Sequence, residues 1–375
     1  MWWLALKILL HRKGRFAITV MGISVSAVLS LNQVSLYLGM MGNATGLIRH
    51  TDADIWVTSK NIQSLDFANL FPERRINQVN ALPDVLSAKR LILTWGFLKL
   101  ADGSREQVQI VGFDPESGAG APWSMVRGSA ADVRGGRYMI LDRSSTPRLG
   151  NMTLGSLWEL NEKQFKLVGL SEGIRTFTTA PFVFVSYEQA QALAGANGRG
   201  QTAFVVGKLH KASDANRVVE TLRATLKDND VYTGRDFILR TAWYWTVQTG
   251  LGMALFLTAL LALFVGGAVV GQTVYASTIE HVREFGTLKA IGARNRDLYK
   301  VILGQAAVSA TIGFAAGSVI VVLLRRAMEQ VGVSLYLGSE LFVGLFFVLL
   351  ATCFLAAHFS IAQVKTLDPM IVFKD

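Results

Sequence analysis

Charged residues are scarce in this chain of 375 residues: they make up 17% of it, whereas hydrophobic residues make up 51%. Soluble domains carry about a quarter charged residues, so this shortage points to a membrane protein. Cysteine is scarcer still, because Cys353 stands alone within an apolar run. An intramolecular disulfide is therefore excluded. A single cysteine also does not indicate whether the chain works in an oxidising or a reducing compartment.

The motifs of several enzyme classes are also absent. The chain has no Gly-x-x-x-x-Gly-Lys-Ser/Thr phosphate loop, no Cys/His metal cluster and no His-Glu-x-x-His. Asp52 and Asp54 are two carboxylates alone, which a solvated turn explains better than a divalent ion. We therefore predict no catalytic residue, cofactor or metal in this chain. The apolar segments also lack the charged residues in their cores that ion-coupled carriers commonly use.

One enzyme motif is present, but its context argues against it. Gly169-Leu-Ser171-Glu-Gly173 matches the Gly-x-Ser-x-Gly nucleophile pattern and follows a strand-like segment. A nucleophile elbow needs a helix next, whereas the β-branched segment 174–181 ends in proline. We interpret the motif as a turn between strands. A membrane-anchored enzyme that uses Ser171 is kept as a minor alternative.

Four apolar segments are long enough to span a bilayer, since about 20 residues cross the hydrocarbon. We place them at residues 16–41, 242–276, 301–324 and 341–364. The first is read as an uncleaved signal anchor, because it lacks the short apolar region and the cleavage site of a signal peptide. Glycines in the second and third segments permit close helix contact: Gly266, Gly267, Gly271, Gly304, Gly313 and Gly317.

Indole rings and basic groups flank these segments. Residues 1–15 form an amphipathic helical segment that ends in a basic cluster, and a second aromatic cluster precedes the second span. Such residues suit the headgroup layer of a membrane. We assign to the membrane interface Trp2, Trp3, Arg12, Lys13, Arg15, Trp243 and Trp245.

Residues 42–241 have a different character, with nearly balanced charges and no run long enough to span a membrane. Short alternating or β-branched segments predict strands at 54–58, 91–100, 107–113, 138–141, 165–170, 182–186 and 203–206. Three further segments predict helices, at 73–81, 187–194 and 213–227, the last with Ser213 as its cap. The chain is therefore predicted to be an α-helical membrane protein with an α+β domain inserted between its first and second spans.

Basic residues indicate the orientation. Placing the N-terminus, residues 277–300 and the tail 365–375 on one side gathers most of the Lys and Arg near the spans: Lys7, Arg12, Lys13, Arg15, Arg283, Lys289, Arg294, Arg296, Lys300, Lys365 and Lys374. The short loop 325–340 offers only Arg325 and Arg326. By the positive-inside rule both termini are cytoplasmic, and the α+β domain is extracytoplasmic.

The polar stretch 277–300, between the second and third spans, is patterned as a short amphipathic helix. Ile279, Val282, Phe285 and Leu288 recur at three-residue spacing and so share one side. A helix of this kind at the cytoplasmic end of a helical hairpin suits contact with a partner protein. Together with the missing nucleotide loop, it suggests that a separate cytoplasmic subunit supplies energy.

This stretch resembles the signature of FtsX-like, MacB-type ABC transporter permeases. In that family a glutamate, an arginine and a glutamate precede a Gly-x-Leu-(Lys/Arg)-Ala-(Ile/Leu)-Gly-Ala run, as Glu280, Arg283 and Glu284 precede residues 286–293 here. The order of segments also fits over the whole chain. Arg12–Arg15, Ala53–Val57 and Val111–Pro115 resemble a DevC-like branch.

The resemblance implies a permease subunit without ATPase activity of its own. The expected assembly is a homodimer in the bacterial inner membrane with two copies of a cytoplasmic ABC ATPase subunit, which would bind ATP and Mg. Contact with that ATPase would fall to Glu280, Arg283, Glu284, Phe285, Gly286, Leu288, Lys289 and Gly292.

By this resemblance, ATP hydrolysis would move the outer domain, a mechanism called mechanotransmission. That motion would export a lipidic or amphipathic substrate with a periplasmic adaptor (membrane fusion) protein and an outer-membrane channel. The other reading left open is that the same machinery regulates an extracytoplasmic enzyme or sensor without cargo. Membrane lipids are expected contacts, and nucleic acid is not.

Overall fold

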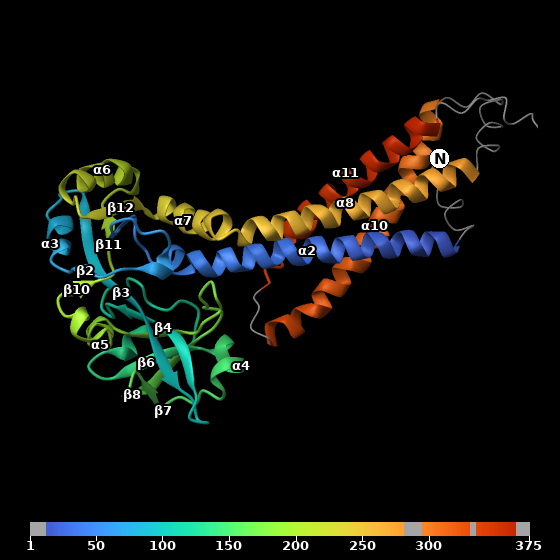
Figure 1. The fold of residues 1–375 in the computed structure, drawn as a ribbon. Helices are drawn as coiled ribbons and strands as arrows, with labels where there is room; N and C mark the ends of the chain where they lie inside the picture. The colour runs from blue at the N-terminus through green and yellow to red at the C-terminus, as the bar shows by residue number, and fades with distance from the viewer. Residues whose placement is uncertain (1–12, 281–294, 331–334, 365–375) are drawn as a thin grey trace, which may run out of the picture. The chain divides into compact units, whose positions relative to one another are not determined.

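The computed structural model describes residues 13–280, 295–330 and 335–364, which form two compact units (Figure 1). The helical unit holds residues 13–38, 253–280, 295–329 and 335–364, and the sheet unit holds residues 39–252 together with Gln330. The sheet unit is thus inserted between the first helix and the second long helix, as the sequence predicts for the α+β domain.

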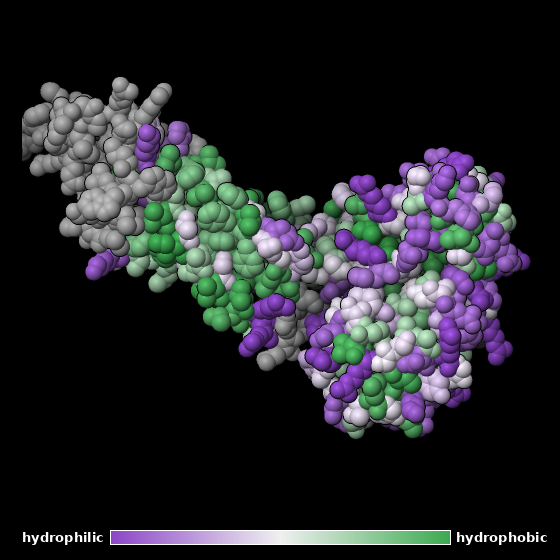
Figure 2. Space-filling view, turned by 180° about the vertical axis from the view of Figure 1, so that it is seen from behind, coloured by the Kyte–Doolittle hydropathy of each residue, from purple (hydrophilic) through white to green (hydrophobic). Residues whose placement is uncertain are grey.

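Long apolar helices make up the helical unit: α2 (Lys13–His50), α8 (Leu251–Glu280), α10 (Asn295–Gln330) and α11 (Ser339–Val364). Each includes a stretch long and apolar enough to cross a membrane: Phe16–His50, Leu251–Ser277, Tyr299–Met328 and Ser339–His358. Figure 2 shows apolar residues over the surface of these helices, as a lipid-facing bundle requires. Helix α2 extends beyond predicted residue 41, and its last turns belong to the sheet unit.

Small residues bring the helices of this unit together. A Cβ atom on Gly317 would lie 2.8 Å from the Ala27 Cβ atom, and one on Gly266 would lie 2.3 Å from the Ser26 Oγ atom. The Ser26 hydroxyl donates a hydrogen bond to the Ala262 carbonyl at 2.6 Å. Larger side chains would force these backbones apart, so glycine sets the approach of α2 to α8 and α10. The predicted role of glycine is confirmed at Gly266, Gly267, Gly313 and Gly317, each of which faces a neighbouring helix.

Strands dominate the sheet unit. They are β1 (Ile55–Ser59), β2 (Phe71–Pro72), β3 (Val85–Lys99), β4 (Arg105–Phe113), β5 (Met125–Arg127), β6 (Tyr138–Asp142), β7 (Leu157–Leu160), β8 (Lys163–Ser171), β9 (Phe182–Ser186), β10 (Gln201–Thr202), β11 (Phe204–Leu209) and β12 (Asn229–Thr233). The main sheet has the order β12-β1-β11-β3-β4-β9-β6-β8-β5, with β7 paired to both β3 and β8. The predicted strand segments are confirmed.

Part of this sheet closes on itself. Pairing runs from β3 to β4, β9, β6, β8 and β7 and returns from β7 to β3, so these strands form a small barrel. Every second side chain points inward and is buried, which fills the barrel with an apolar core. That core includes Ile92, Leu98, Val108, Ile110, Met139, Leu141, Leu160, Phe165, Leu167, Val183 and Val185.

Helices and short turns complete the sheet unit. The helices are α3 (Arg75–Asn80), α4 (Thr146–Leu149), α5 (Tyr187–Leu193), α6 (Ala215–Thr225) and α7 (Gly234–Trp243), followed by a π-helix, η6 (Tyr244–Gln248). The 3-10 turns are η1 (Leu65–Phe67), η2 (Ala130–Val133), η3 (Arg143–Ser145), η4 (Gly195–Gly198) and η5 (Ala212–Asp214).

Two predictions about α6 have different outcomes. Its predicted apolar stripe is confirmed, because Val218, Val219, Leu222 and Leu226 are all buried. Ser213, however, is not the cap: it lies inside η5, and α6 follows Asp214, which makes no capping side-chain bond. The 3-10 turn satisfies the first backbone groups in place of a hydroxyl.

Candidate functional site: the junction around Trp245

The predicted ATPase-contact residues lie mostly outside the described residues. Glu280 is the last residue of α8 and is exposed. The remainder of that set falls outside: Arg283, Glu284, Phe285, Gly286, Leu288, Lys289 and Gly292. Of the predicted interface residues, Trp2, Trp3 and Arg12 also fall outside, Lys13 is the exposed first residue of α2, and Arg15 follows in the same helix.

The two tryptophans assigned to the second membrane interface lie in different environments. Trp243 ends α7 and is 60% exposed. Trp245 lies in the π-helix and is half-buried, and its indole Nε1 atom donates a hydrogen bond to Asp66 Oδ2 at 3.1 Å. Its ring stacks on Phe177, with ring centroids 3.7 Å apart and an angle of 16° between the planes. Trp245 therefore joins two separate segments of the sheet unit to the helix that precedes α8.

Asp66 is the polar end of this junction. It lies in η1, almost completely buried, and accepts hydrogen bonds from the Ser64 hydroxyl at 3.0 Å and from Trp245. Burial raises the pKa of the Asp66 carboxyl, although both of these hydrogen bonds favour the ionised form. The Gln109 side chain lies close enough to favour that form too, yet among the described residues neither of its amide atoms has a hydrogen-bond partner of normal geometry. Asp66 and Trp245 therefore form a buried polar contact with unused hydrogen-bonding capacity beside it.

Phe177 is held in place by a network at the start of the loop between β8 and β9. The buried Asp142 carboxylate accepts bonds from the Ser171 hydroxyl at 2.9 Å and from the backbone N–H groups of Gly173 and Ile174. Arg175 donates to the Ser144 carbonyl at 2.6 Å. Because these bonds fix the loop on both sides of its bend, the Phe177 ring is presented to Trp245 rather than left free.

The same network determines the role of Ser171 in the Gly-x-Ser-x-Gly motif. Ser171 is the last residue of β8, is fully buried and donates its hydroxyl proton to Asp142. A serine nucleophile needs a neighbouring base and access to substrate. Ser171 therefore has a structural role, in agreement with the predicted turn between strands.

The Asp52 and Asp54 pair is also structural. Lys208 pairs with Asp52 at 2.5 Å, and Asp54 accepts the backbone N–H of Leu209 at 2.9 Å. Across residues 13–280, 295–330 and 335–364 no group of three or more His, Cys, Asp or Glu side chains could hold a metal ion.

Further contacts tie helices α7 and α2 to the rest of the sheet unit. The Arg240 guanidinium donates to the Ile62 carbonyl at 2.6 Å, and the Thr241 hydroxyl accepts a long bond of 3.4 Å from the Leu65 backbone N–H. At the end of α2, the His50 ring stacks on Trp123 with centroids 4.1 Å apart and planes nearly parallel. Both helices through which the chain enters and leaves the sheet unit are thus packed into it.

Asp66, Phe177 and the His50–Trp123 stack were missed by the sequence analysis. A signal for Trp245 was present in the spacing, because Phe237, Thr241 and Trp245 recur every four residues and face the sheet unit. Leu239, Trp243 and Val247 form the opposite, exposed stripe. Four-residue spacing therefore separates the packed tryptophan from the exposed one.

Comparisons with known proteins cover most of the chain. The family model of the MacB-like periplasmic core domain matches residues 16–225, more than half of the chain, and that of the FtsX-like permease C-terminal matches residues 256–369. An uncharacterized ABC transporter permease of Mycobacterium tuberculosis is 22% identical over 377 residues, which is 98% of each chain. One of Methanocaldococcus jannaschii is 23% identical over 229 residues, covering 58% of this chain and 56% of its own length. Macrolide export ATP-binding/permease protein MacB 1 of Yersinia pestis is 40% identical over 99 residues, covering 26% of this chain and 14% of that protein.

Proposed function

Because the chain belongs to the FtsX-like ABC transporter permeases that carry a MacB-like periplasmic core domain, we propose that it converts ATP hydrolysis by a separate subunit into motion of its sheet unit. The family and the four apolar helices make it a multi-pass protein of the inner membrane. ATP and Mg would bind to the partner ATPase. Both termini would be cytoplasmic and the sheet unit extracytoplasmic.

The observation that carries this proposal is the pair of contacts between Trp245 and the sheet unit, a hydrogen bond to Asp66 and a ring stack on Phe177. Helix α8 starts at Leu251, directly after the π-helix and Gly250, and ends at Glu280 where the predicted ATPase-contact stretch begins. If the ATPase displaces that stretch, it also displaces the Glu280 end of α8. At the other end the Trp245 indole is bound to Asp66 and stacked on Phe177, so the displacement would reach two loops of the sheet unit together. Breaks such as π-helices are frequent at functional positions.

The proposed cargo is lipidic or amphipathic, passed on by a periplasmic adaptor and an outer-membrane channel. The macrolide export relative is consistent with efflux of an amphipathic compound. Of Asp, Glu, Lys and Arg, α8 holds Glu280 at its very end and α11 holds Glu340 at its start, and α11 also carries His358 in its second half. The middle of each of these two helices therefore offers no permanently charged path for an ion. In a homodimer of this chain with two ATPase subunits, ATP hydrolysis would move both sheet units in the same way.

The test compares Trp245→Ala with the matched variant Trp243→Ala in the complex of the full chain with the ATPase that copurifies with it. The first readout is the rate of ATP hydrolysis. The second is the nucleotide-dependent change, meaning the difference between the EPR spectra with and without nucleotide, of a spin label attached through Ser104→Cys at an exposed position in the β3–β4 turn. The natural thiol of Cys353 is buried and so stays unlabelled. We expect Trp245→Ala to retain ATP hydrolysis and lose at least ~80% of the nucleotide-dependent change, because a hot-spot contact is removed. Trp243→Ala should keep both.

Two results would contradict the proposal. If Trp243→Ala loses the nucleotide-dependent change as fully as Trp245→Ala does, the two tryptophans act together as a membrane anchor, and the contacts of Trp245 with Asp66 and Phe177 are not the route. If Trp245→Ala moves the label as the wild type does, the stroke takes another route. A pull-down with the sheet unit as bait separates the two functions of the machine, since capture of an adaptor supports export and capture of a hydrolase or sensor supports regulation.

A further inference from the structure

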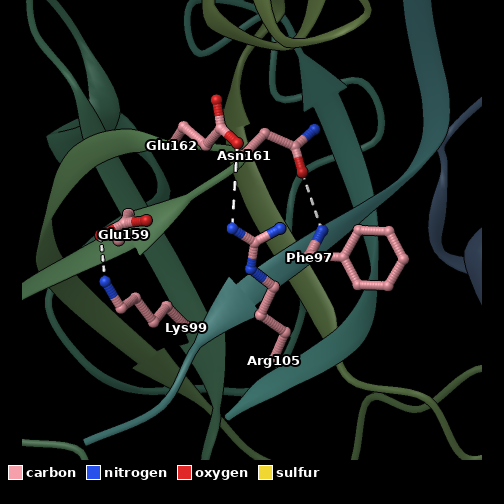
Figure 3. A pocket seen from close by; sticks show the side chains of 6 residues that line it. All are labelled: Phe97, Lys99, Arg105, Glu159, Asn161 and Glu162. Atoms are coloured by element: carbon pink, nitrogen blue, oxygen red, sulfur yellow. Dashed lines mark hydrogen bonds and ion pairs between the residues drawn. The ribbon is translucent and has the colours of Figure 1, made fainter. Parts of the chain in front are cut away.

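A small hollow lies on the outer wall of the barrel, far in sequence from the Trp245 junction. It has a volume of about 220 Å³ and is lined by Phe97, Lys99, Arg105, Glu159, Asn161 and Glu162 (Figure 3). These residues come from β3, the start of β4, the end of β7 and the turn into β8. The hollow shares no residue with the junction.

Backbone contacts fix the shape of this hollow. Asn161 and Glu162 both have positive φ angles, 46° and 63°, and form the two-residue turn between β7 and β8. The Asn161 Oδ1 atom accepts the Phe97 backbone N–H at 2.8 Å, and the Asn161 N–H donates to the Phe97 carbonyl at 3.0 Å. A Cβ atom at Gly96 would come within 2.9 Å of Asn161 Oδ1, so the turn could not close on β3 with a larger residue. The lining is therefore held in position before any ligand arrives.

The charges in the hollow balance one another. Lys99 Nζ lies 3.1 Å from Glu159 Oε2, and Arg105 Nη2 lies 3.8 Å from Glu162 Oε1. Two cations and two carboxylates leave no net charge, which disfavours an anion or a cation as ligand. The same groups offer many hydrogen bonds, since ammonium and guanidinium groups supply several N–H donors and each carboxylate has several acceptor sites.

One side of the hollow is apolar. Phe97 is 51% exposed, and Figure 3 shows its ring on the other side of Arg105 from the Lys99–Glu159 pair. Trp95, two residues earlier on the same face of β3, is 38% exposed. A ligand that fills the hollow therefore needs an apolar face for the ring and a polar edge with several hydroxyl groups for the ion pairs.

From this combination we propose that the hollow binds one neutral sugar ring of an extracytoplasmic glycan. The axial C–H groups of a pyranose form an apolar face that rests on an aromatic ring, and its hydroxyls both donate and accept. Ligand sites usually measure about 300–1,000 Å³, so this smaller one takes a single ring and binds it weakly. Affinity for a polymer would come from repeated engagement by several copies of the chain. The source of the ring is either a glycan polymer or the headgroup of a glycolipid.

The experiment uses the full-length chain in lauryldimethylamine oxide, a detergent without sugar, and saturation-transfer NMR with four probes: maltose, N,N′-diacetylchitobiose, galacturonic acid and glucosamine. We expect transfer to a neutral disaccharide with a millimolar Kd, and at least ~10-fold weaker binding to the acid and the amine. Phe97→Ala should weaken neutral binding ~10-fold. Leu86→Ala, an exposed side chain on the same strand outside the hollow, should leave it unchanged.

A second variant tests the charge argument without changing the shape of the hollow. Glu159→Gln leaves a net positive charge, so the preference should shift from the neutral probe toward galacturonic acid. Soluble disaccharide binding that is outcompeted by mixed micelles of lauryldimethylamine oxide with 10% monoglucosyldiacylglycerol, and not by micelles with phosphatidylcholine instead, assigns the ring to a glycolipid. Competition by a soluble glucan of ten or more rings assigns it to a polymer.

The proposal is overturned if no neutral sugar shows transfer, or if Phe97→Ala binds as the wild type does. It also fails if no sugar binds and a photoreactive amino acid at position 97 crosslinks to a protein in cells, which would make the hollow a protein contact. None of these readouts involves ATP hydrolysis, so this proposal and the proposed function can fail separately.

Discussion

Replacing Trp245 with phenylalanine isolates the hydrogen bond at the junction from the stacking. A phenyl ring keeps an aromatic face for Phe177, but it cannot donate to Asp66, which is 8% exposed. Removing the donor leaves a buried acceptor oxygen unsatisfied, which costs roughly 1–3 kcal/mol. We therefore expect local opening of η1 and the π-helix to become easier by about 2 kcal/mol.

The assay is amide hydrogen exchange on the full chain at pH 8. Since 1.4 kcal/mol corresponds to a factor of ten, the amides of Asp66 and Phe67 should exchange about 30-fold faster in Trp245→Phe. Trp243→Phe is the matched control, because Trp243 is 60% exposed and surface substitutions usually change stability by less than about 0.5 kcal/mol. Equal exchange in the two variants would refute the reasoning, since the bond to Asp66 would then contribute nothing.

Three further predictions concern the ATPase contact, the buried carboxyl and the helix packing. Phe285→Ala should lower coupling by about 2 kcal/mol, measured as transport per ATP hydrolysed; normal coupling in a stable complex would contradict the predicted contact. Burial raises the pKa of Asp66 above its ordinary 3.8, so the folded state keeps this proton to a higher pH than the unfolded state does. The free energy of unfolding therefore falls as the pH rises from the unfolded pKa through the folded pKa. Asp66→Asn should remove this contribution, so the difference in Tm between pH 4 and pH 7 should change by that amount. Gly317→Val places new atoms within 2.8 Å of Ala27 and should cost about 1–3 kcal/mol in detergent, whereas Gly344→Val, with no atom within 4 Å, should cost far less; equal losses of Tm would exclude close packing at Gly317.

Much of the sheet unit could be predicted from the sequence because its buried strands are β-branched and alternate. Strands β3, β4, β8 and β9 were found for that reason. Strand β12 was missed because it begins with Asn229 and Asp230, which resemble a turn. Strands β2 and β10 have two residues each and leave no periodic signal. Closure of the barrel depends on β7 reaching both β3 and β8, which is a property of distant pairing.

The junction was harder to predict than the fold. Asp66 and Trp245 are 179 residues apart in sequence, and each one alone fits a bland role: an acidic residue in a turn and an indole at a membrane boundary. Phe177 lies in an irregular loop whose course is set by bonds to Asp142 and Ser144. Local patterns carry no information about such a meeting of three segments. The residues predicted for ATPase contact, by comparison, rest on the resemblance of a continuous stretch.

Strand β3 has a mechanical consequence for the whole sheet unit. Its first part pairs with β11 and its second part pairs with β4, without any loop between Leu91 and Ile92. Its fifteen residues form one continuous strand with a length of about 50 Å. Torque applied to one half of the sheet cannot be absorbed by a flexible joint, so it must turn the barrel as well. A modest rotation near β11 then sweeps the hairpin tip at Lys99 and Arg105 through the largest arc, and whatever sits on that tip is moved the most.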